Sequence, residues 1–164
     1  MGSRSIILKK HVEFAYIAGF LDGDGSIMLQ IKKRSDARIG WRFMCTICFY
    51  QDSRHEKPLY WIRKKLNIGY ISKRNDRITE LRINGYNQCE KIMKSLYPYI
   101  RFKKPQAEAF LRAAHLLKRK QAGALTSTEK QRLIKYMMKI QSCNYQSSGK
   151  RSAAQYKKMI GLTP

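Results

Sequence analysis

The chain has 164 residues, of which 34 are lysine or arginine and only 11 are acidic, giving a formal net charge of +23. Its apolar fraction of 43% supports one domain with a real core and excludes a disordered polycation. The charge indicates a polyanionic partner, with nucleic acid as the leading candidate. No apolar run approaches the roughly 20 residues that span a bilayer, and no secretory or myristoylation signal is found, so we expect an intracellular protein.

The hydrophobic pattern divides the chain into three parts. Residues 1–10 are expected to form a loose basic arm, residues 11–144 one domain, and residues 145–164 a mobile basic tail rich in Ser, Gly, Lys and Gln. No internal repeat is found.

The first predicted helix spans residues 11–23 and carries two stripes. The apolar stripe follows helical spacing: Phe14, Ile17, Ala18 and Leu21. The second stripe consists of small residues four apart: Ala15, Gly19 and Gly23. Because both stripes favour burial, this helix is expected to pack on two sides.

The remaining pattern alternates between pairs of strands and helices. Strict alternation predicts strands, and capping signals and helical spacing predict helices. The predicted strands are 26–34, 41–51, 69–73 and 77–83. The predicted helices are 56–66, 87–97, one beginning near Pro105, and one opened by a capping box at Thr126–Glu129. This order indicates an α+β domain with one antiparallel sheet backed by helices. The sheet's other face carries polar and basic residues, either as a nucleic-acid surface or as a merely solvated face.

Two of the four cysteines, Cys45 and Cys48, form a CxxC pair, which raises the possibility of zinc. They lie inside a predicted strand, where residues three apart point to opposite faces. No second pair follows. We therefore predict reduced thiols rather than a zinc site.

Residues 22–25 read Asp-Gly-Asp-Gly at the carboxyl end of the first helix. The partial negative charge of a helix carboxyl end disfavours carboxylates, so something positive should compensate. Charge and spacing leave three explanations open: a divalent cation bound by carboxylate and carbonyl oxygens, a lysine partner, or a plain turn.

The segment 17–25, IAGFLDGDG, resembles the LAGLIDADG motif in its variant ending in DGDG. Three downstream segments occur in the order and approximate spacing of single-motif family members: Phe49-Tyr50-Gln51, Leu66 through Gly69-Tyr70, and residues 98–107, PYIRFKKPQA. The resemblance covers residues 12–118. It implies an αββαββα core with a four-stranded sheet forming a saddle.

Since only one copy of the motif is present, the resemblance implies a homodimer joined through its motif helices. Close approach of two helices needs small residues, which Ala15, Gly19 and Gly23 supply. Both copies of Asp24 would then meet at the two-fold axis, where like charges require cations.

The resemblance also implies roles for single residues. Asp24 is the expected metal ligand, with the carbonyl of Gly23 as a second ligand, whereas Asp22 is closer to a structural cap. The expected metal is Mg²⁺, with Mn²⁺ or Ca²⁺ substituting for binding. Gln51 is expected to order water near the metal, and Lys103 to lie near the scissile phosphate.

Arg54 and His55 are candidates for basic groups that support this site. Here the sequence departs from the family pattern, because the segment 52–57 is longer and more mixed in charge than in some relatives.

A two-stranded ribbon fits the major groove, where each base pair presents a distinct pattern of donors and acceptors. The expected DNA-binding residues are the outward side chains of the sheet, which would read bases or, alternatively, contact phosphates or only solvent. They are Ser26, Met28, Gln30, Lys32, Arg34, Arg42, Met44, Thr46, Cys48, Ser72, Arg74, Glu80 and Arg82.

The function implied is that of an intron-encoded homing endonuclease. It would make a staggered double-strand break in a long, pseudo-palindromic duplex DNA by metal-dependent hydrolysis. No small-molecule cofactor and no membrane partner are expected. The protein is expected wherever the intron-bearing DNA resides, in the cytoplasm or in an organelle. The alternatives are an RNA-splicing maturase of the same fold and a noncatalytic nucleic-acid-binding protein.

Overall fold

The computed structural model describes residues 3–35, 38–120, 122–144 and 150–162. The helices are α1 (Ser3–Asp24), η1 (Ser53–His55), α2 (Lys57–Leu66), α3 (Tyr86–Leu96), η2 (Tyr97–Tyr99), α4 (Lys104–Arg119), η3 (Ala122–Ala124), α5 (Ser127–Ser142) and α6 (Ala153–Met159). The strands are β1 (Ser26–Lys33), β2 (Trp41–Asp52), β3 (Tyr70–Lys73) and β4 (Ile78–Asn84). Within the described ranges, no helix is both long and apolar enough to cross a membrane.

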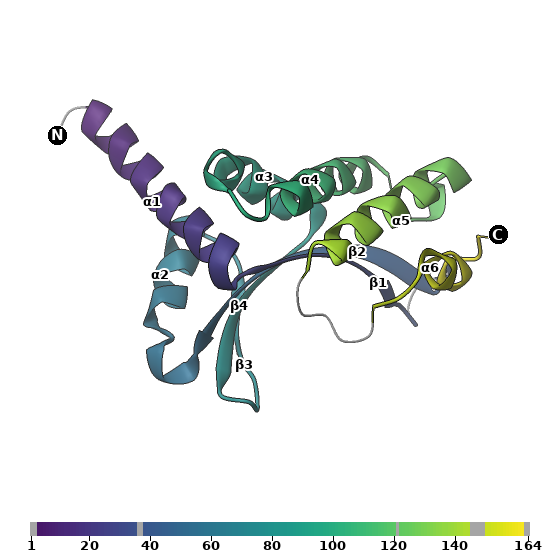
Figure 1. The fold of residues 1–164 in the computed structure, drawn as a ribbon, viewed down its shortest axis with the longest axis horizontal. Helices are drawn as coiled ribbons and strands as arrows, with labels where there is room; N and C mark the ends of the chain where they lie inside the picture. Colours follow the sequence, from purple (N-terminus) through teal and green to yellow (C-terminus); the bar gives the residue numbers. More distant parts are fainter. Residues whose placement is uncertain (1–2, 36–37, 121, 145–149, 163–164) are drawn as a thin grey trace.

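The four strands form one antiparallel sheet, as the order of the predicted elements indicated, and the strand order in it is β1-β2-β4-β3. Helices α3, α4 and α5 lie together on one side of this sheet (Figure 1). The core between the two layers is apolar, with Phe43, Phe49 and Phe110 among its fully buried side chains. The α+β architecture expected from the sequence is therefore confirmed.

Strand register puts the even-numbered residues of all four strands on one face. Ser26 pairs with Cys48, which pairs in turn with Arg82, and Arg82 pairs with Tyr70. Odd-numbered residues such as Ile47 and Leu81 are buried in the core beneath the helices. The even face is thus the face that α3, α4 and α5 leave uncovered, and we call it the saddle face.

Both ends of the chain contain more helix than predicted. Helix α1 begins at Ser3, so the described part of the expected loose arm continues the helix. At the other end, α6 begins with a capping box between Ser152 and Gln155, and Ile160 after it is buried. Helix α6 packs on α5, so part of the predicted mobile tail is ordered; residues 145–149 of that tail lie outside the described ranges.

The predicted capping box at the start of α5 is confirmed. The Thr126 hydroxyl accepts a hydrogen bond from the Glu129 backbone N–H at 3.2 Å, and the Glu129 carboxylate accepts one from the Thr126 N–H at 2.9 Å. These two bonds satisfy groups that the first turn of a helix leaves without partners, so the local sequence fixes where α5 begins.

The cysteines are free thiols, and Cys45, Cys48 and Cys89 are buried. Cys45 belongs to the core cluster, whereas Cys48 lies on the saddle face near Glu80, so the CxxC pair points in opposite directions as predicted. Burial raises the pKa of Cys48 to about 11 and that of Cys89 to about 12. Both therefore remain protonated at neutral pH.

Candidate functional site: the end of the motif helix and the saddle face

Asp22, in the last turn of α1, is buried and anchors a distant segment of the chain. Its Oδ2 accepts hydrogen bonds from the backbone N–H groups of Arg101 at 2.5 Å and Phe102 at 3.0 Å. Its Oδ1 accepts from the N–H of Lys103 at 2.9 Å. Asp22 therefore ties the turn before α4 to the end of α1, in agreement with its expected structural role.

The side chain of Lys103 makes further hydrogen bonds between the same two segments. Its ammonium Nζ donates to the carbonyl oxygens of Leu21 at 2.9 Å, Asp22 at 2.5 Å and Gly23 at 3.1 Å. Burial lowers the pKa of Lys103, while the charges of Asp22 and Asp24 oppose that shift. A lysine thus compensates the negative helix end, one of the explanations that charge and spacing left open.

Asp24 is the last residue of α1 and is exposed, as is Gly23. The next residue, Gly25, leaves no room for a side chain, because a Cβ there would lie 2.8 Å from both the Cα and the carbonyl oxygen of Leu21. The chain consequently turns from α1 directly into β1. This turn presents the Asp24 carboxylate and the Gly23 carbonyl at the surface.

The protomer does not by itself assemble a full set of metal ligands. Across the described ranges, no three His, Cys, Asp or Glu side chains lie where they could hold an ion together. Asp24 and the Gly23 carbonyl supply hard oxygen donors of the kind that Mg²⁺ and Ca²⁺ prefer. The donor types fit such an ion, and completing the set requires oxygens from water, a phosphate or a second protomer.

The small-residue stripe of α1 is exposed in the protomer, so only one side of this helix packs within the chain. Ala15, Gly19 and Gly23 face outward, and an added Cβ at either glycine would meet nothing within 4 Å. Large apolar side chains are exposed nearby: Val12 is 60% exposed and Tyr16 58%. This combination leaves an apolar surface on the outer side of α1 that the described residues do not cover.

The saddle face holds most of the predicted DNA-binding residues. Lys32 and Arg42 are opposite each other in the register and are both exposed. Intermediate exposure is found for a further group, consisting of Ser26, Met28, Gln30, Arg34, Met44, Ser72 and Arg82. Arg74, directly after β3, is exposed and forms an ion pair with Asp76 at 2.6 Å.

Three predicted contact residues lie on this face but are buried. The Thr46 hydroxyl donates to Asn84 Oδ1 at 2.7 Å, and Cys48 Sγ lies 4.0 Å from Glu80. Glu80 accepts two hydrogen bonds from the guanidinium of Arg82, at 3.0 and 2.9 Å. Thr46, Cys48 and Glu80 therefore organise neighbouring side chains and present little surface of their own.

The structure adds three residues to this face that the sequence analysis omitted. Tyr50, Tyr70 and Asn84 occupy even positions, and Asn84 Nδ2 donates to the Tyr70 hydroxyl at 3.2 Å. Extending the strict alternation along each strand would have included Tyr50 and Tyr70. Asn84 was missed because β4 runs one residue beyond its predicted end.

The other predicted site residues lie around the end of β2. Gln51 is half-buried, and its Oε1 accepts from the Asp52 N–H at 2.9 Å, which leaves its NH₂ group as a donor. Arg54 makes a two-pronged ion pair with Asp52 at 3.0 and 2.8 Å, and these bonds hold the pKa of Asp52 well below its usual range. His55 is exposed. The structure brings Lys103, but neither Arg54 nor His55, into hydrogen-bond contact with the end of α1.

An αββαββα domain with an acidic helix end next to an uncovered, basic sheet face defines a recognisable class of protein. The sequence profile of the LAGLIDADG endonuclease family matches residues 17–112, more than half of the chain. The chain belongs to this family.

Individual relatives agree with this assignment. DNA endonuclease I-CvuI of Chlorella vulgaris is 32% identical over 100 residues, which cover 61% of this chain and 62% of that protein. DNA endonuclease I-CreI of Chlamydomonas reinhardtii is 26% identical over 97 residues, which cover 59% of each. The chain thus aligns with about three-fifths of the length of these relatives.

Solved structures share the fold over nearly the full length. I-CvuI in complex with its target in the presence of Ca superposes with a TM-score of 0.78 and 24% identity, covering 96% of this chain and 99% of that one. The archaeal intron-encoded homing endonuclease I-Vdi141I, complexed with DNA, gives a TM-score of 0.77 at 21% identity, covering 92% and 95%.

Proposed function

We propose that this protein is a homodimeric homing endonuclease that cuts both strands of a long, pseudo-palindromic duplex DNA by divalent-metal-dependent phosphodiester hydrolysis. The observation that carries the proposal is the exposed Asp24 carboxylate at the end of a helix whose outer face is also exposed. Pairing two such helices would bring two copies of this carboxylate to one place. The relatives' names and DNA-bound structures support the same activity.

The dimer forms through the outer face of α1 in this proposal. Gly19 and Gly23 allow close helix approach, and burial of Val12 and Tyr16 supplies apolar contact area. Phe102, whose backbone N–H is held by Asp22 at the end of α1, is 79% exposed and adds to this area. These large apolar side chains are costly to leave in water, which favours association.

Asp24 and the Gly23 carbonyl are the groups that would hold the cation, with Mg²⁺ as the proposed ion and Mn²⁺ or Ca²⁺ as substitutes for binding. When bound, such an ion supplies charge neutralisation and Lewis-acid polarisation at a phosphate oxygen. Asp22 fixes the backbone at the end of α1, the helix whose last residue is Asp24.

Lys103 provides positive charge beside the same helix end, where it would stabilise charge that develops on the phosphate. Gln51, fixed through its oxygen, is proposed to use its NH₂ group to position water. Arg54 and His55 would add further basic charge around the site formed by Lys103 and Gln51.

The saddle face would lie in the DNA grooves, where the exposed Lys32 and Arg42 and the half-buried Gln30 reach bases or phosphates. The face carries several cations, so duplex binding should weaken as salt rises.

The test is cleavage of duplex DNA that spans the insertion site of the host intron, with and without Mg²⁺. We expect a Mg²⁺-dependent double-strand break with staggered ends. Asp24→Asn should bind the same DNA without cutting it, because it removes the ligand charge and keeps the shape. Binding without any cleavage by the parent protein would favour the maturase or noncatalytic alternatives, and cleavage by Asp24→Asn at the parental rate would exclude the proposed metal site.

A further inference from the structure

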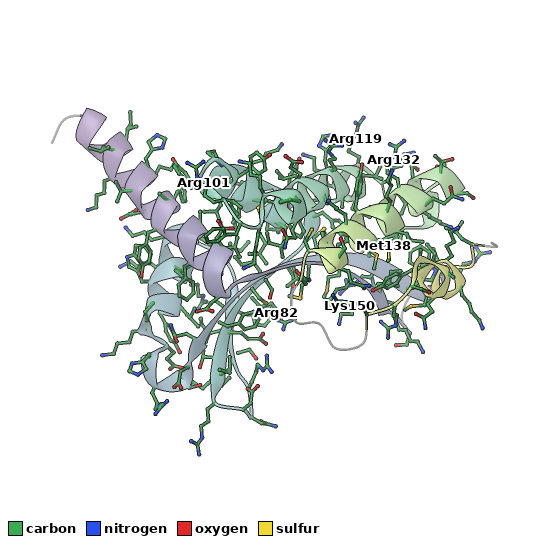
Figure 2. All side chains as sticks on the ribbon, viewed as in Figure 1. Arg82, Arg101, Arg119, Arg132, Met138 and Lys150 are labelled. Atoms are coloured by element: carbon green, nitrogen blue, oxygen red, sulfur yellow. The ribbon has the colours of Figure 1, made fainter. Side chains whose placement is uncertain are left out.

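A hollow of about 590 Å³ lies between α4 and α5, away from the saddle face. Its lining residues come from both helices and the connection between them: Arg112, His115, Leu116, Arg119, Lys120, Glu129, Arg132 and Tyr136. Figure 2 shows Arg119 and Arg132 on the outer side of the helical layer, with Arg82 on the opposite side of the sheet. The layer of helices and sheet therefore separates this hollow from the proposed duplex interface.

The hollow has an excess of positive charge that the described residues do not neutralise. Lys120 forms an ion pair with Glu129 at 2.7 Å, and His115 contacts the buried Glu90 at 3.0 Å. The arginines Arg112, Arg119 and Arg132 are exposed, and the described ranges give none of them a carboxylate within ion-pair distance. Because these three arginines line one hollow, their positive charges add there and favour a bound anion.

The chemistry of these side chains favours a phosphate group as the bound anion. A guanidinium presents a planar fork of N–H donors that matches the oxygens of a phosphate. The hollow also contains an apolar and aromatic part: Leu116 and Tyr136 are half-buried and pack against the core. An aromatic ring beside arginines is the arrangement on which an unpaired base stacks while the backbone follows the cations.

We propose that the hollow between α4 and α5 is a second nucleic-acid site that binds a single-stranded segment. The phosphates of this segment contact Arg112, Arg119 and Arg132, and one of its bases stacks on the Tyr136 ring. A base-paired duplex suits the site less well, because its bases are stacked on each other and are not available to the Tyr136 ring. This site is separate from the saddle face and does not depend on the endonuclease activity.

Binding of labelled single strands to the full-length protein tests this proposal. The probes are oligouridine RNA and oligothymidine DNA of about 12 nucleotides, with fluorescence anisotropy measured over a series of salt concentrations. The main variant is Arg119→Ala combined with Arg132→Ala. Its matched control is Arg63→Ala combined with Lys64→Ala, which removes the same charge from exposed positions of α2. Circular dichroism establishes that each variant is folded.

We expect the Arg119–Arg132 variant to bind single strands more weakly and to reduce the slope of log K against log salt by about 1.4, or roughly 0.7 per phosphate contact. Tyr136→Leu, which keeps an apolar side chain, should weaken binding by about fivefold or more. The α2 control should bind as the parent does. A saddle-face variant, Lys32→Ala with Arg42→Ala, should lose duplex affinity and keep single-strand affinity.

Three results would overturn the proposal: neither probe binds, the Arg119–Arg132 variant binds single strands as tightly as the parent, or unlabelled duplex displaces the strand from the parent in equimolar competition. A tighter complex with the RNA probe than with the DNA probe would identify the 2′-hydroxyl as part of the recognition and RNA as the natural source. The reverse preference would identify single-stranded DNA. A loss of cleavage activity alone would not contradict this site, because the experiment measures the binding of single strands.

Discussion

Asp22 and Lys103 are joined by two hydrogen bonds, and in each of them Lys103 donates and Asp22 accepts. Asp22 Oδ1 accepts from the backbone N–H of Lys103 at 2.9 Å, and Lys103 Nζ donates to the backbone carbonyl of Asp22 at 2.5 Å. Each residue thus uses its side chain to satisfy the backbone of the other. This reciprocal pair fixes the end of the motif helix, where Asp24 is the last residue, against the start of α4.

The two aspartates should differ sharply in what their removal does to stability. Asp22→Ala leaves three N–H groups, those of Arg101, Phe102 and Lys103, without their acceptor, and should lower the free energy of unfolding by at least about 2 kcal/mol. Asp24→Ala removes an exposed carboxylate and should change stability by less than about 0.5 kcal/mol. Urea denaturation measures both. Equal losses would contradict the structural role of Asp22.

A large side chain at Gly19 should separate the proposed dimer without harming the protomer. A Cβ at Gly19 meets nothing within 4 Å in the chain, and leucine is a better helix former than glycine. Light scattering after size exclusion should therefore show Gly19→Leu as a monomer with native circular dichroism. Gly123→Leu, at another exposed and open position, is the control and should remain a dimer. A dimeric Gly19→Leu protein would mean that α1 is not the interface.

Acid should destabilise the contact between α3 and α4 through Glu90. Burial alone would raise the pKa of Glu90, but hydrogen bonds from Lys118, Lys94 and His115 lower it to about 2. Because the pKa of the folded state lies below the ordinary value of 4.5, the stabilisation is fully present above pH 4.5 and is lost as pH falls towards 2.

The measurement is the free energy of unfolding across this pH range. We expect Glu90 to contribute about 1–3 kcal/mol, since its partners are partly exposed to solvent. Glu90→Gln should be less stable than the parent at neutral pH and should show a flatter decline between pH 4.5 and 2. An unchanged decline in this variant would assign the acid sensitivity to other carboxylates.

The salt dependence of duplex binding should identify which lysine and arginine side chains contact DNA phosphates. If Lys32 neutralises one phosphate, Lys32→Ala should reduce the slope of log K against log salt for duplex binding by about 0.9. Lys139→Ala removes an exposed charge from α5, on the other side of the sheet, and should leave the slope unchanged. Equal slopes for the parent and Lys32→Ala would show that Lys32 does not contact a phosphate.

Local patterns in the sequence determined most of the fold. Alternation placed the four strands to within a few residues, because side chains of a half-buried strand must point alternately to core and solvent. The Thr126–Glu129 capping box located the start of α5 for an equally local reason. The position of Cys45 and Cys48 inside one strand also settled their opposite orientation.

Only the tertiary structure decided which residues meet across the chain. Lys103 is one cation among 34, and nothing in its local sequence indicates that its ammonium reaches the end of a helix about 80 positions earlier. The network that buries Thr46, Cys48 and Glu80 depends on neighbouring strands in register, and the basic hollow depends on the packing of α4 against α5. Periodicity specifies which face of an element is buried, whereas the partner that covers it follows from long-range packing.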